Sequence, residues 1–389
     1  MDQRSVNRLL NIVGVVTFAT SLFTRSVDPV IPQIATALVV DTKTAALLST
    51  AFALPYAVLQ PLLGPLADVI GKARMMTLCL VLLTVASLAS ALAESFPVLL
   101  SLRMFSGIVS GGIFPAAMAF AADLAPIERR QVAISRILFA GMSGNLLGAS
   151  AAGIVADLIG WRGVFVVVGA LGALAFVAAV AGFRGSPVQV PRIPLKAVPA
   201  SYRVILANPN AKVCFGAVFL EGIFIFGVFP YVALLLLAGG EARASIAGLV
   251  IAGFSIGGVV YTMLVGRLLG MVGQRRIMIG GAIVAAFALS VVALDLRWPM
   301  ALVAFAMLGL GFYLLHGSIQ VFMTELAPEA RGASASLHSS SFFLGQAIGP
   351  IFYGLGFAWI GEDATLIVSA IAVVLIGFGS VRLLRAPGK

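Results

Sequence analysis

Four charged side chains stand inside long apolar stretches of the chain, where they suggest chemistry with protons or ions. Arg25 and Asp28 are three residues apart, so on a helix they share one face. Arg103 and Glu221 each lie in a separate apolar stretch. A charge in the middle of a bilayer costs several kcal/mol, so such a residue normally faces the protein interior and has a function.

These residues predict a pair of proton-exchanging carboxyl groups, Asp28 and Glu221. Arg25 and Arg103 would then tune these carboxyl groups or hold an anionic group. Glu221 lies among phenylalanines in the sequence, which makes it the better candidate for a proton carrier, or a partner for a cationic ligand. The simpler interpretation is that Arg25 and Asp28 neutralise each other and that Glu221 only makes a hydrogen bond within the protein.

Further along the chain, histidine, glutamine and aromatic residues are candidates for lining a cavity. His316 has Gln320 about one helical turn along, and His338 follows in the next apolar stretch. A lone histidine on a helix is more often a hydrogen-bonded packing residue than a ligand. The aromatic run from Phe224 to Tyr231 would either line a cavity for an amphiphile or face lipid, and both interpretations stay open. The candidates for a substrate cavity are Arg25, Arg103, His316, Gln320, His338 and Phe224.

The composition predicts a membrane protein. Hydrophobic residues make up 61% of the chain and charged residues 10%, whereas a soluble domain carries about 25% charged residues. Cys79 and Cys214 both lie in apolar stretches, where a thiol packs as a small hydrophobe. The sequence has no phosphate-binding loop, no evident Ser/His/Asp set and no cluster of metal ligands, so we expect neither an enzyme nor a resident cofactor or metal.

The chain repeats itself, which indicates two similar halves. The segment 124–129, Leu-Ala-Pro-Ile-Glu-Arg, returns as Leu-Ala-Pro-Glu-Ala-Arg at 326–331. The pattern Gly64, Gly71, Arg74 also has a counterpart in the second half. An apolar chain made of two similar halves is typical of a transporter with a site between them. We expect a first bundle over 1–183, a linker over 184–209 and a second bundle over 210–389.

The apolar stretches predict an all-α fold. Each is long enough to cross a bilayer, which needs about 20 residues. Twelve transmembrane helices, six in each half, are expected near residues 8–38, 43–67, 73–93, 96–124, 128–158, 161–183, 210–238, 243–270, 274–295, 298–326, 329–360 and 363–384.

The charge distribution predicts the orientation. The chain has a net charge of +10, but its basic residues gather in alternate loops, which is the pattern of a membrane protein and argues against nucleic acid as a partner. The loops on the poorer side hold only Lys43, Arg162, Arg243 and Arg297. We therefore expect a multi-pass protein of the cytoplasmic (inner) membrane with both termini in the cytoplasm, and a basic linker near anionic lipid headgroups.

Several motifs resemble those of the major facilitator superfamily. The segment 64–74, with Gly64, Asp68, Gly71 and Arg74, matches the signature between helices 2 and 3 of that superfamily. Residues 103–107 resemble its helix-4 motif. Residues 28–32 resemble the helix-1 motif of its twelve-helix drug:proton antiporter branch. The segment 316–328 looks like a group of sugar or metabolite efflux permeases in the same branch.

The resemblance implies a secondary active transporter whose two six-helix bundles open alternately to each side. Its expected partners are a small organic molecule, protons and the lipid bilayer, with proton-coupled export as the activity and a monomer as the working unit. An organic-anion or metabolite carrier, or a facilitator of the same fold, is the alternative, and a channel is the less favoured one. The charges of the signature would form a conformational latch that holds one state and breaks in the other. Its members are Gly64, Asp68, Gly71, Arg74 and Arg129.

Overall fold

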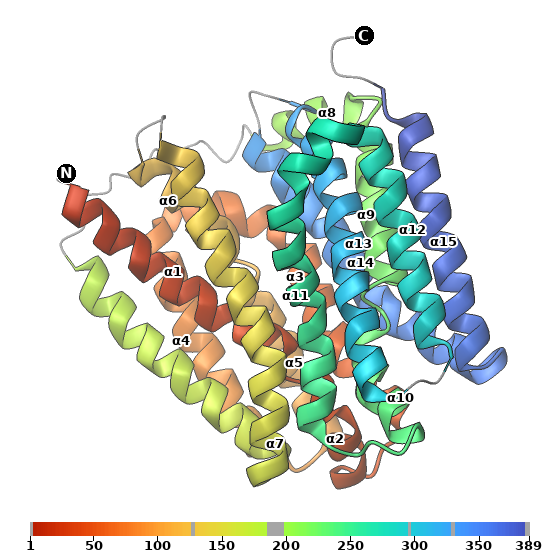
Figure 1. Ribbon diagram of the computed structural model, residues 1–389. Helices are drawn as coiled ribbons and strands as arrows, with labels where there is room; N and C mark the ends of the chain where they lie inside the picture. Colours follow the sequence, from red (N-terminus) through yellow and green to blue (C-terminus); the bar gives the residue numbers. More distant parts are fainter. Residues whose placement is uncertain (1–2, 126–128, 185–197, 295–296, 328–330, 386–389) are drawn as a thin grey trace.

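The computed structural model describes residues 3–125, 129–184, 198–294, 297–327 and 331–385, and within these ranges the chain is helical and has no strand (Figure 1). The all-α prediction is therefore confirmed. The first half contains α1 (Gln3–Arg25), η1 (Asp28–Val30), α2 (Ile31–Ala37), α3 (Thr42–Ile70), α4 (Lys72–Ala91), α5 (Phe96–Ser110), α6 (Ile113–Leu124) and α7 (Arg130–Phe183). The remainder contains α8 (Val198–Ala207), α9 (Ala211–Phe224), η4 (Phe229–Tyr231), α10 (Val232–Ala238), α11 (Ala244–Val272), α12 (Gln274–Val292), α13 (Trp298–Thr324), α14 (Arg331–Trp359) and α15 (Glu362–Leu383).

By length and composition, 11 segments of the described chain are able to cross a membrane. One of them, Val132–Phe183 in α7, has 52 residues. A helix of that length would measure roughly 80 Å, well over twice the hydrocarbon core of a bilayer. It is interrupted at Gly160, whose φ of 77° lies in the left-handed region that glycine adopts without steric cost. The segment therefore crosses twice, and the described residues make the twelve crossings that the sequence predicts.

Three of the predicted crossings are broken along their length. The first is divided into α1, η1 and α2, and the seventh into α9, η4 and α10. Both short 3₁₀ turns have proline as their second residue, Pro29 in η1 and Pro230 in η4, and proline has no N–H for the helical ladder. The fourth crossing changes from α5 to α6 at Gly111 and Gly112. The breaks in the first and seventh crossings occupy equivalent places in the two halves, and η1 contacts η4.

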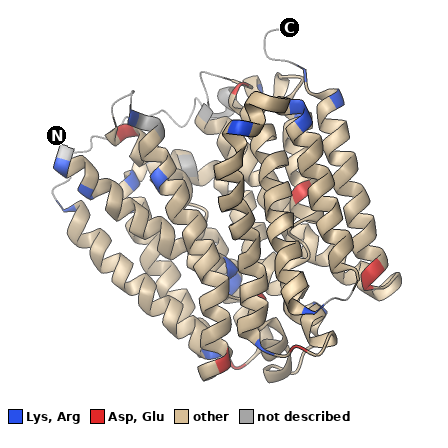
Figure 2. Ribbon diagram, in the orientation of Figure 1, with Lys and Arg blue, Asp and Glu red and all other residues tan. Residues whose placement is uncertain are grey.

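The helices form two six-helix bundles. Within the first, α7 packs along α1 and α4, and α3 packs along α5; within the second, α13 packs along α11 and α12, and α9 along α14. The bundles meet where α3 contacts α14 and where α7 contacts α11. The start of α1, the end of α15 and α8 lie at one end of the protein, named here the linker end, and α2 and α10 lie at the other, the α10 end (Figure 1). Charged residues gather at these two ends, and few positions between them are charged (Figure 2).

The helix α8 lies in the segment predicted as a linker, where no helix was predicted. The Tyr202 hydroxyl donates to the carbonyl oxygen of Pro61 in the first bundle, at 2.7 Å. Just beyond α8, the Asn208 amide donates to the carbonyl oxygen of Leu326 in the second bundle, at 2.9 Å. This part of the linker thus touches both bundles. Residues 185–197 of the predicted linker lie outside the described residues.

The two bundles contact each other through small residues. A Cβ atom on Gly153 of α7 would lie 2.2 Å from the carbonyl oxygen of Ala244 in α11, so only glycine fits there. Between α3 and α14, the Thr50 hydroxyl donates to the carbonyl oxygen of Ala347 at 2.7 Å, and the Ser340 hydroxyl donates to that of Ala57 at 2.6 Å. These contacts hold the bundles closely together at the α10 end and along α3.

A carboxylate of the first bundle caps a helix of the second at the α10 end. The two oxygens of Asp157 in α7 accept hydrogen bonds from the backbone N–H groups of Ala244 and Ser245, both at 2.9 Å. The first N–H groups of a helix have no partner within it, and the positive helix N-terminus favours a negative group. Asp157 therefore fastens the two bundles together through the start of α11.

We expect Asp157→Ala to make the α10 end open more often. Removing a capping carboxylate destabilises the closed state by about 1 kcal/mol. This lowers the ratio of closed to open molecules roughly fivefold. Spin labels at the exposed positions Ile159 and Leu237, one in each bundle, should report a larger population at long distance in electron-electron resonance.

The matched control is Glu241→Gln at the same end. Hydrogen bonds from Arg243 lower the pKa of Glu241 to about 2, so this carboxylate is ionised at neutral pH, but its partner belongs to the same bundle. The distance distribution should be unchanged in this variant. An unchanged distribution in Asp157→Ala as well would show that the cap does not hold the bundles together.

Candidate functional site

A cavity lies between the two bundles where the first and seventh crossings are broken. Its volume of about 20 Å³ is enough for a water molecule and too small for an organic one. Both bundles contribute to its lining, which consists of Thr24, Arg25, Ser49, Phe52 and Ala53 from the first and Phe226, Pro230, Phe343, Gln346 and Pro350 from the second. A site between the halves is where the sequence repeat predicts one.

Arg25, at the end of α1, connects the two bundles across this cavity. Its Nη1 donates to Asp28 Oδ2 at 3.2 Å in its own bundle, and its Nη2 donates to Gln346 Oε1 at 2.7 Å in the other. The guanidinium also lies over the rings of Phe226 and Phe229, 4.9 and 4.7 Å from their centroids. Cation–π contacts of this kind strengthen when water is excluded, and the Arg25 side chain is only 12% exposed.

Asp28 is fully occupied by neighbours from its own bundle. The side chain is buried, with Oδ2 bound by Arg25 and Oδ1 accepting from the Ser49 hydroxyl at 2.7 Å. The pairing with Arg25 that the three-residue spacing predicts is therefore present. Asp28 is the first residue of the 3₁₀ turn η1, so its carboxylate stands at the break in the first crossing.

Arg103, on α5, is buried close to the same cavity, and no carboxylate of the described residues is hydrogen-bonded to it. Its Nε lies 3.5 Å from the carbonyl oxygen of Leu48, and its Nη1 donates to that of Phe23 at 3.3 Å. The guanidinium lies 4.6 Å from the ring centroid of Phe52, a residue of the cavity lining. Asp28 attracts Arg103 through space, and the two arginines thus share one carboxylate.

The second bundle holds a buried group of three ionisable side chains from three helices. Glu221 Oε2 on α9 lies 2.7 Å from His316 Nδ1 on α13, and His316 Nε2 lies 3.4 Å from His338 Nε2 on α14. Glu221 is completely buried. Among the described residues, Glu221 Oε1 and His338 Nδ1 have no hydrogen-bond partner. A chain of titratable groups with an unpaired atom at each end is able to accept or release a proton.

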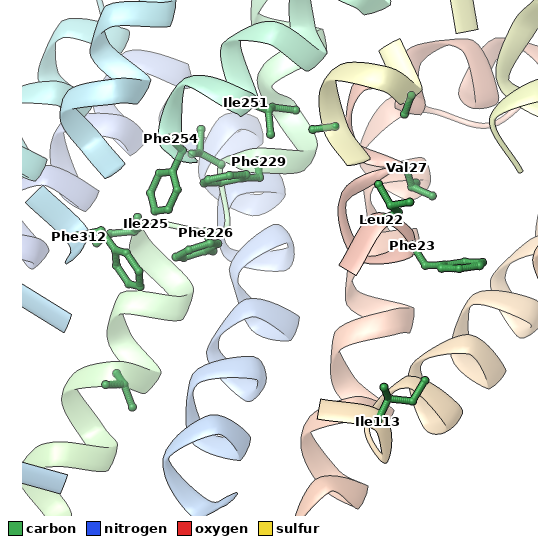
Figure 3. Packing of buried hydrophobic residues seen from close by; sticks show 14 of the residues in the cluster. Leu22, Phe23, Val27, Ile113, Ile225, Phe226, Phe229, Ile251, Phe254 and Phe312 are labelled. Carbon is green, nitrogen blue, oxygen red and sulfur yellow. The ribbon is translucent and has the colours of Figure 1, made fainter. Parts of the chain in front are cut away.

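Aromatic rings separate this group, named here the Glu221–His316–His338 group, from Arg25. The Phe312 ring stacks on His316 with centroids 4.7 Å apart, and Phe226 lies 5.1 Å from Phe312. Figure 3 shows Phe226, Phe229, Phe254 and Phe312 gathered in one cluster. Phe226 and Phe229 are buried, as is Tyr231. These three residues therefore do not face lipid, and a role of the run in lining a cavity for an amphiphile stays a prediction.

Two further candidates lie apart from these contacts. Gln320, one turn beyond His316, is exposed, and Phe224 packs on Phe352 with ring centroids 5.1 Å apart. In the aromatic run it is Phe226 that lines the cavity.

The predicted latch is described only in part. The side chains at positions 64 and 68 lie outside what the structure describes, so the role of Gly64 and Asp68 stays a prediction. Gly71 separates α3 from α4 with a φ of 101°, which requires glycine. Arg74 and Arg129 are exposed at the linker end. Lys72, the neighbouring signature residue, is buried and pairs with Asp123 of α6.

Sequence reasoning missed Gln346, which joins Arg25 from the opposite bundle. The available signal was a polar amide among the small and apolar residues of 345–349, a segment that belongs to the internal repeat. It also missed Asp157 and Ser49, whose partners are distant in sequence. Short-range spacing alone gives no sign of such contacts.

Comparison with known proteins gives matches over essentially the whole chain. A family model described as the Major Facilitator Superfamily matches residues 13–350 and 217–389. The uncharacterised MFS-type transporter YfhI of Bacillus subtilis is 26% identical, over 99% of this chain and 91% of that protein. The quinolone resistance protein NorA of Staphylococcus aureus is 25% identical over 84% of both. A D-xylose–proton symporter of known structure has the same fold, with a TM-score of 0.79, 17% identity, and coverage of 100% of this chain and 99% of that one.

The shared carboxylate of Asp28 predicts an asymmetry between two substitutions. Asp28→Asn leaves Arg25 and Arg103 without a counter-charge and should destabilise the protein by about 3–5 kcal/mol, as breaking a buried ion pair does. Arg25→Gln should cost less, because Arg103 still offsets the charge of Asp28. Thermal unfolding of the purified variants measures both effects.

The double variant Arg25→Gln/Asp28→Asn should recover part of the stability lost in Asp28→Asn. If Asp28→Asn unfolds at the same temperature as the wild type, or Arg25→Gln is the less stable of the two, the two arginines do not depend on this carboxylate.

Proposed function

The chain belongs to the Major Facilitator Superfamily, and on this basis we propose that it is a secondary active transporter that couples export of a small organic molecule to the inward flow of protons. The observation that carries the proton coupling is the buried Glu221 carboxyl, with one oxygen beside His316 and the other without a partner among the described residues. The fold and family are those of transporters that span the membrane several times.

Alternating access is supported by the way the bundles are joined. The Arg25–Gln346 bond joins the two bundles at the cavity, and the cap that Asp157 places on α11 joins them at the α10 end. Both are polar contacts between the two bundles, and a small rotation of one bundle breaks them. Release at the α10 end requires that these contacts separate.

Glu221 suits proton coupling for an electrostatic reason. A carboxylate at this depth has lost its water, and no Lys or Arg side chain is bonded to it within the described part of the chain. Protonation removes the charge, so a change of conformation with the carboxyl neutral avoids moving a bare charge through the membrane interior. Asp28 is the second candidate, but its oxygens are already bound by Arg25 and Ser49.

The names of the similar proteins agree with this proposal. One relative is a quinolone resistance protein, and the structural neighbour is a sugar–proton symporter. Resistance to a drug is a property expected of an exporter, and a symporter couples its substrate to protons. For this chain they support a small organic substrate and proton coupling, and export is the direction we propose.

The orientation proposed is the one given by the basic loops. By the direction of the chain, Lys72, Arg74 and Arg129 fall at the same end as α8, the start of α1 and the end of α15, so we propose that this end faces the cytoplasm across the inner membrane. We propose two structural units, the bundles 1–183 and 210–389, joined by the segment 184–209. We also propose that the signature around Asp68 forms the latch of the linker end.

An organic-anion carrier or facilitator is the second candidate, and one observation favours it. The charges beside the cavity are two arginines, Arg25 and Arg103, and one carboxylate, Asp28. Such a carrier has the same fold and the same cavity but does not require Glu221 to change its protonation.

We expect Glu221→Gln to uncouple transport from protons. The amide resembles the protonated carboxyl, so exchange of a bound compound across the membrane should continue, while accumulation driven by a pH gradient should fall to the level of equilibration. The measurement uses proteoliposomes and a compound that stabilises the purified protein against heat. Glu94→Gln, which changes an exposed carboxyl outside the helices, is the matched control and should transport normally.

Full pH-driven accumulation in both Glu221→Gln and Asp28→Asn would contradict proton coupling through either carboxyl. The facilitator interpretation would then replace the proposal.

A further inference from the structure

We propose that the cavity beside Arg25 binds the anionic group of an organic anion with a flat apolar or aromatic body, and that the amide oxygen of Gln346 occupies the position of the ligand's anionic oxygen. This inference rests on the proposed transport function, because it names the substrate class of the same site. It is carried by the hydrogen bonds of Arg25, by the charges around the cavity and by the residues that line it.

The Arg25–Gln346 bond is the one that an anion is able to replace. A guanidinium has five N–H donors, and the bonds described for Arg25 use two of them, for Asp28 and Gln346. The amide oxygen of Gln346 is a neutral acceptor. A carboxylate oxygen makes a hydrogen bond roughly twice as strong with a cationic donor and often binds arginine through both of its oxygens. An anionic ligand therefore displaces Gln346 and leaves the Asp28 pair intact.

The charges around the cavity favour an anion over a cation. Arg25 and Arg103 carry two positive charges and Asp28 one negative charge, so one positive charge is in surplus. The described hydrogen bonds of Arg103 go to carbonyl oxygens, which orient the guanidinium without neutralising it. An uncompensated charge within a membrane is unfavourable. A bound anion therefore lowers this free-energy cost, whereas a bound cation raises it.

Among the residues that the structure describes, no free carboxylate lines this cavity for a cationic ligand. The two oxygens of Asp28 accept hydrogen bonds from Arg25 and Ser49. Glu221 is bound to His316 and does not belong to the lining. Arg25 is the ionisable side chain of that lining, within the part of the chain that the structure describes.

The lining also indicates the body of the ligand. Phe52, Phe226 and Phe343 are aromatic, and Ala53, Pro230 and Pro350 are apolar. The polar side chains beside Arg25 are Thr24, Ser49 and Gln346. A sugar needs a hydrogen-bond partner for most of its hydroxyl groups, and unpaired polar groups in a buried site are unfavourable. Rings and prolines instead suit a flat apolar body held at one end by a charge.

Displacement of Gln346 also connects binding with motion. Gln346 belongs to the second bundle and Arg25 to the first, so their bond holds the bundles together. The cavity of about 20 Å³ has no room for an organic molecule while this bond is made. An anion that takes the place of Gln346 therefore removes one inter-bundle bond as it binds, and the space it needs appears as the bundles separate.

The first test compares three probes of one shape on the purified wild-type protein: 2-naphthoate, 2-naphthamide and 2-naphthylmethylammonium. Thermal stabilisation and calorimetry should detect the carboxylate with an affinity at least about tenfold higher than the neutral amide or the ammonium, as expected when a charge-assisted bond to arginine replaces a neutral one. Equal affinity for the three probes, preference for the ammonium, or no binding of the carboxylate would overturn the inference.

The second test uses two substitutions at one position. Gln346→Glu supplies a carboxylate from the protein itself, so it should raise the melting temperature and reduce the affinity for 2-naphthoate about tenfold or more. Gln346→Ala removes the competing oxygen and should bind 2-naphthoate at least as tightly as the wild type. Undiminished binding of 2-naphthoate by Gln346→Glu, or loss of binding in Gln346→Ala with the protein still folded, would contradict the proposed position.

The outcomes distinguish this inference from the proposed function. Selective binding of 2-naphthoate without accumulation under a pH gradient would leave the anion site standing and refute proton coupling. Accumulation of the ammonium or amide probe under a pH gradient, without carboxylate binding, would refute the anion site and leave proton coupling standing.

Discussion

The loss of water around a charge inside a membrane is the constraint on which the central structure depends. Ionisable side chains in the interior are few, and each is placed against a specific partner. Asp28 receives hydrogen bonds from Arg25 and Ser49, Arg103 is held by carbonyl oxygens and the Phe52 ring, and Glu221 has His316 beside it. Asp28 stands at the break in the first crossing, and Glu221 lies one turn before the break in the seventh, so two of these groups lie at or near helix breaks.

The two broken crossings show how the backbone serves this placement. In η1 and η4 a proline follows the first residue of a 3₁₀ turn, and the two turns hold equivalent places in the repeat. The first turn begins with Asp28 and the second with Phe229, which lies under the Arg25 guanidinium. The same break, repeated in both halves, thus places an anion from one bundle and an aromatic face from the other against the same cation, Arg25.

The fold could be predicted from the sequence because the apolar stretches are long and the motifs recur in both halves. Apolar runs predict the twelve crossings to within a few residues, and the recurring motif predicts two bundles. The pair Arg25–Asp28 was also predictable, since its spacing is local. The pairs Glu221–His316 and Arg25–Gln346 were not, because each joins side chains from helices that are brought together only by packing. Proline at positions 29 and 230 was a visible sign of the breaks, but an apolar run that includes proline still resembles a continuous span.

The aromatic rings between Arg25 and the Glu221–His316–His338 group separate the two charged places without isolating them. Phe226 and Phe312 are poorly polarisable compared with water, so an electric field passes through them with little screening. The contacts from Arg25 to Phe226, from Phe226 to Phe312 and from Phe312 to His316 measure 4.9, 5.1 and 4.7 Å, so Arg25 and His316 lie at most about 15 Å apart. At that distance and an effective dielectric constant of about 20, two unit charges interact by about 1 kcal/mol, which is roughly a fivefold bias. A change of charge on one side of this aromatic layer therefore alters the energy of a charge on the other side, although no atom passes between them.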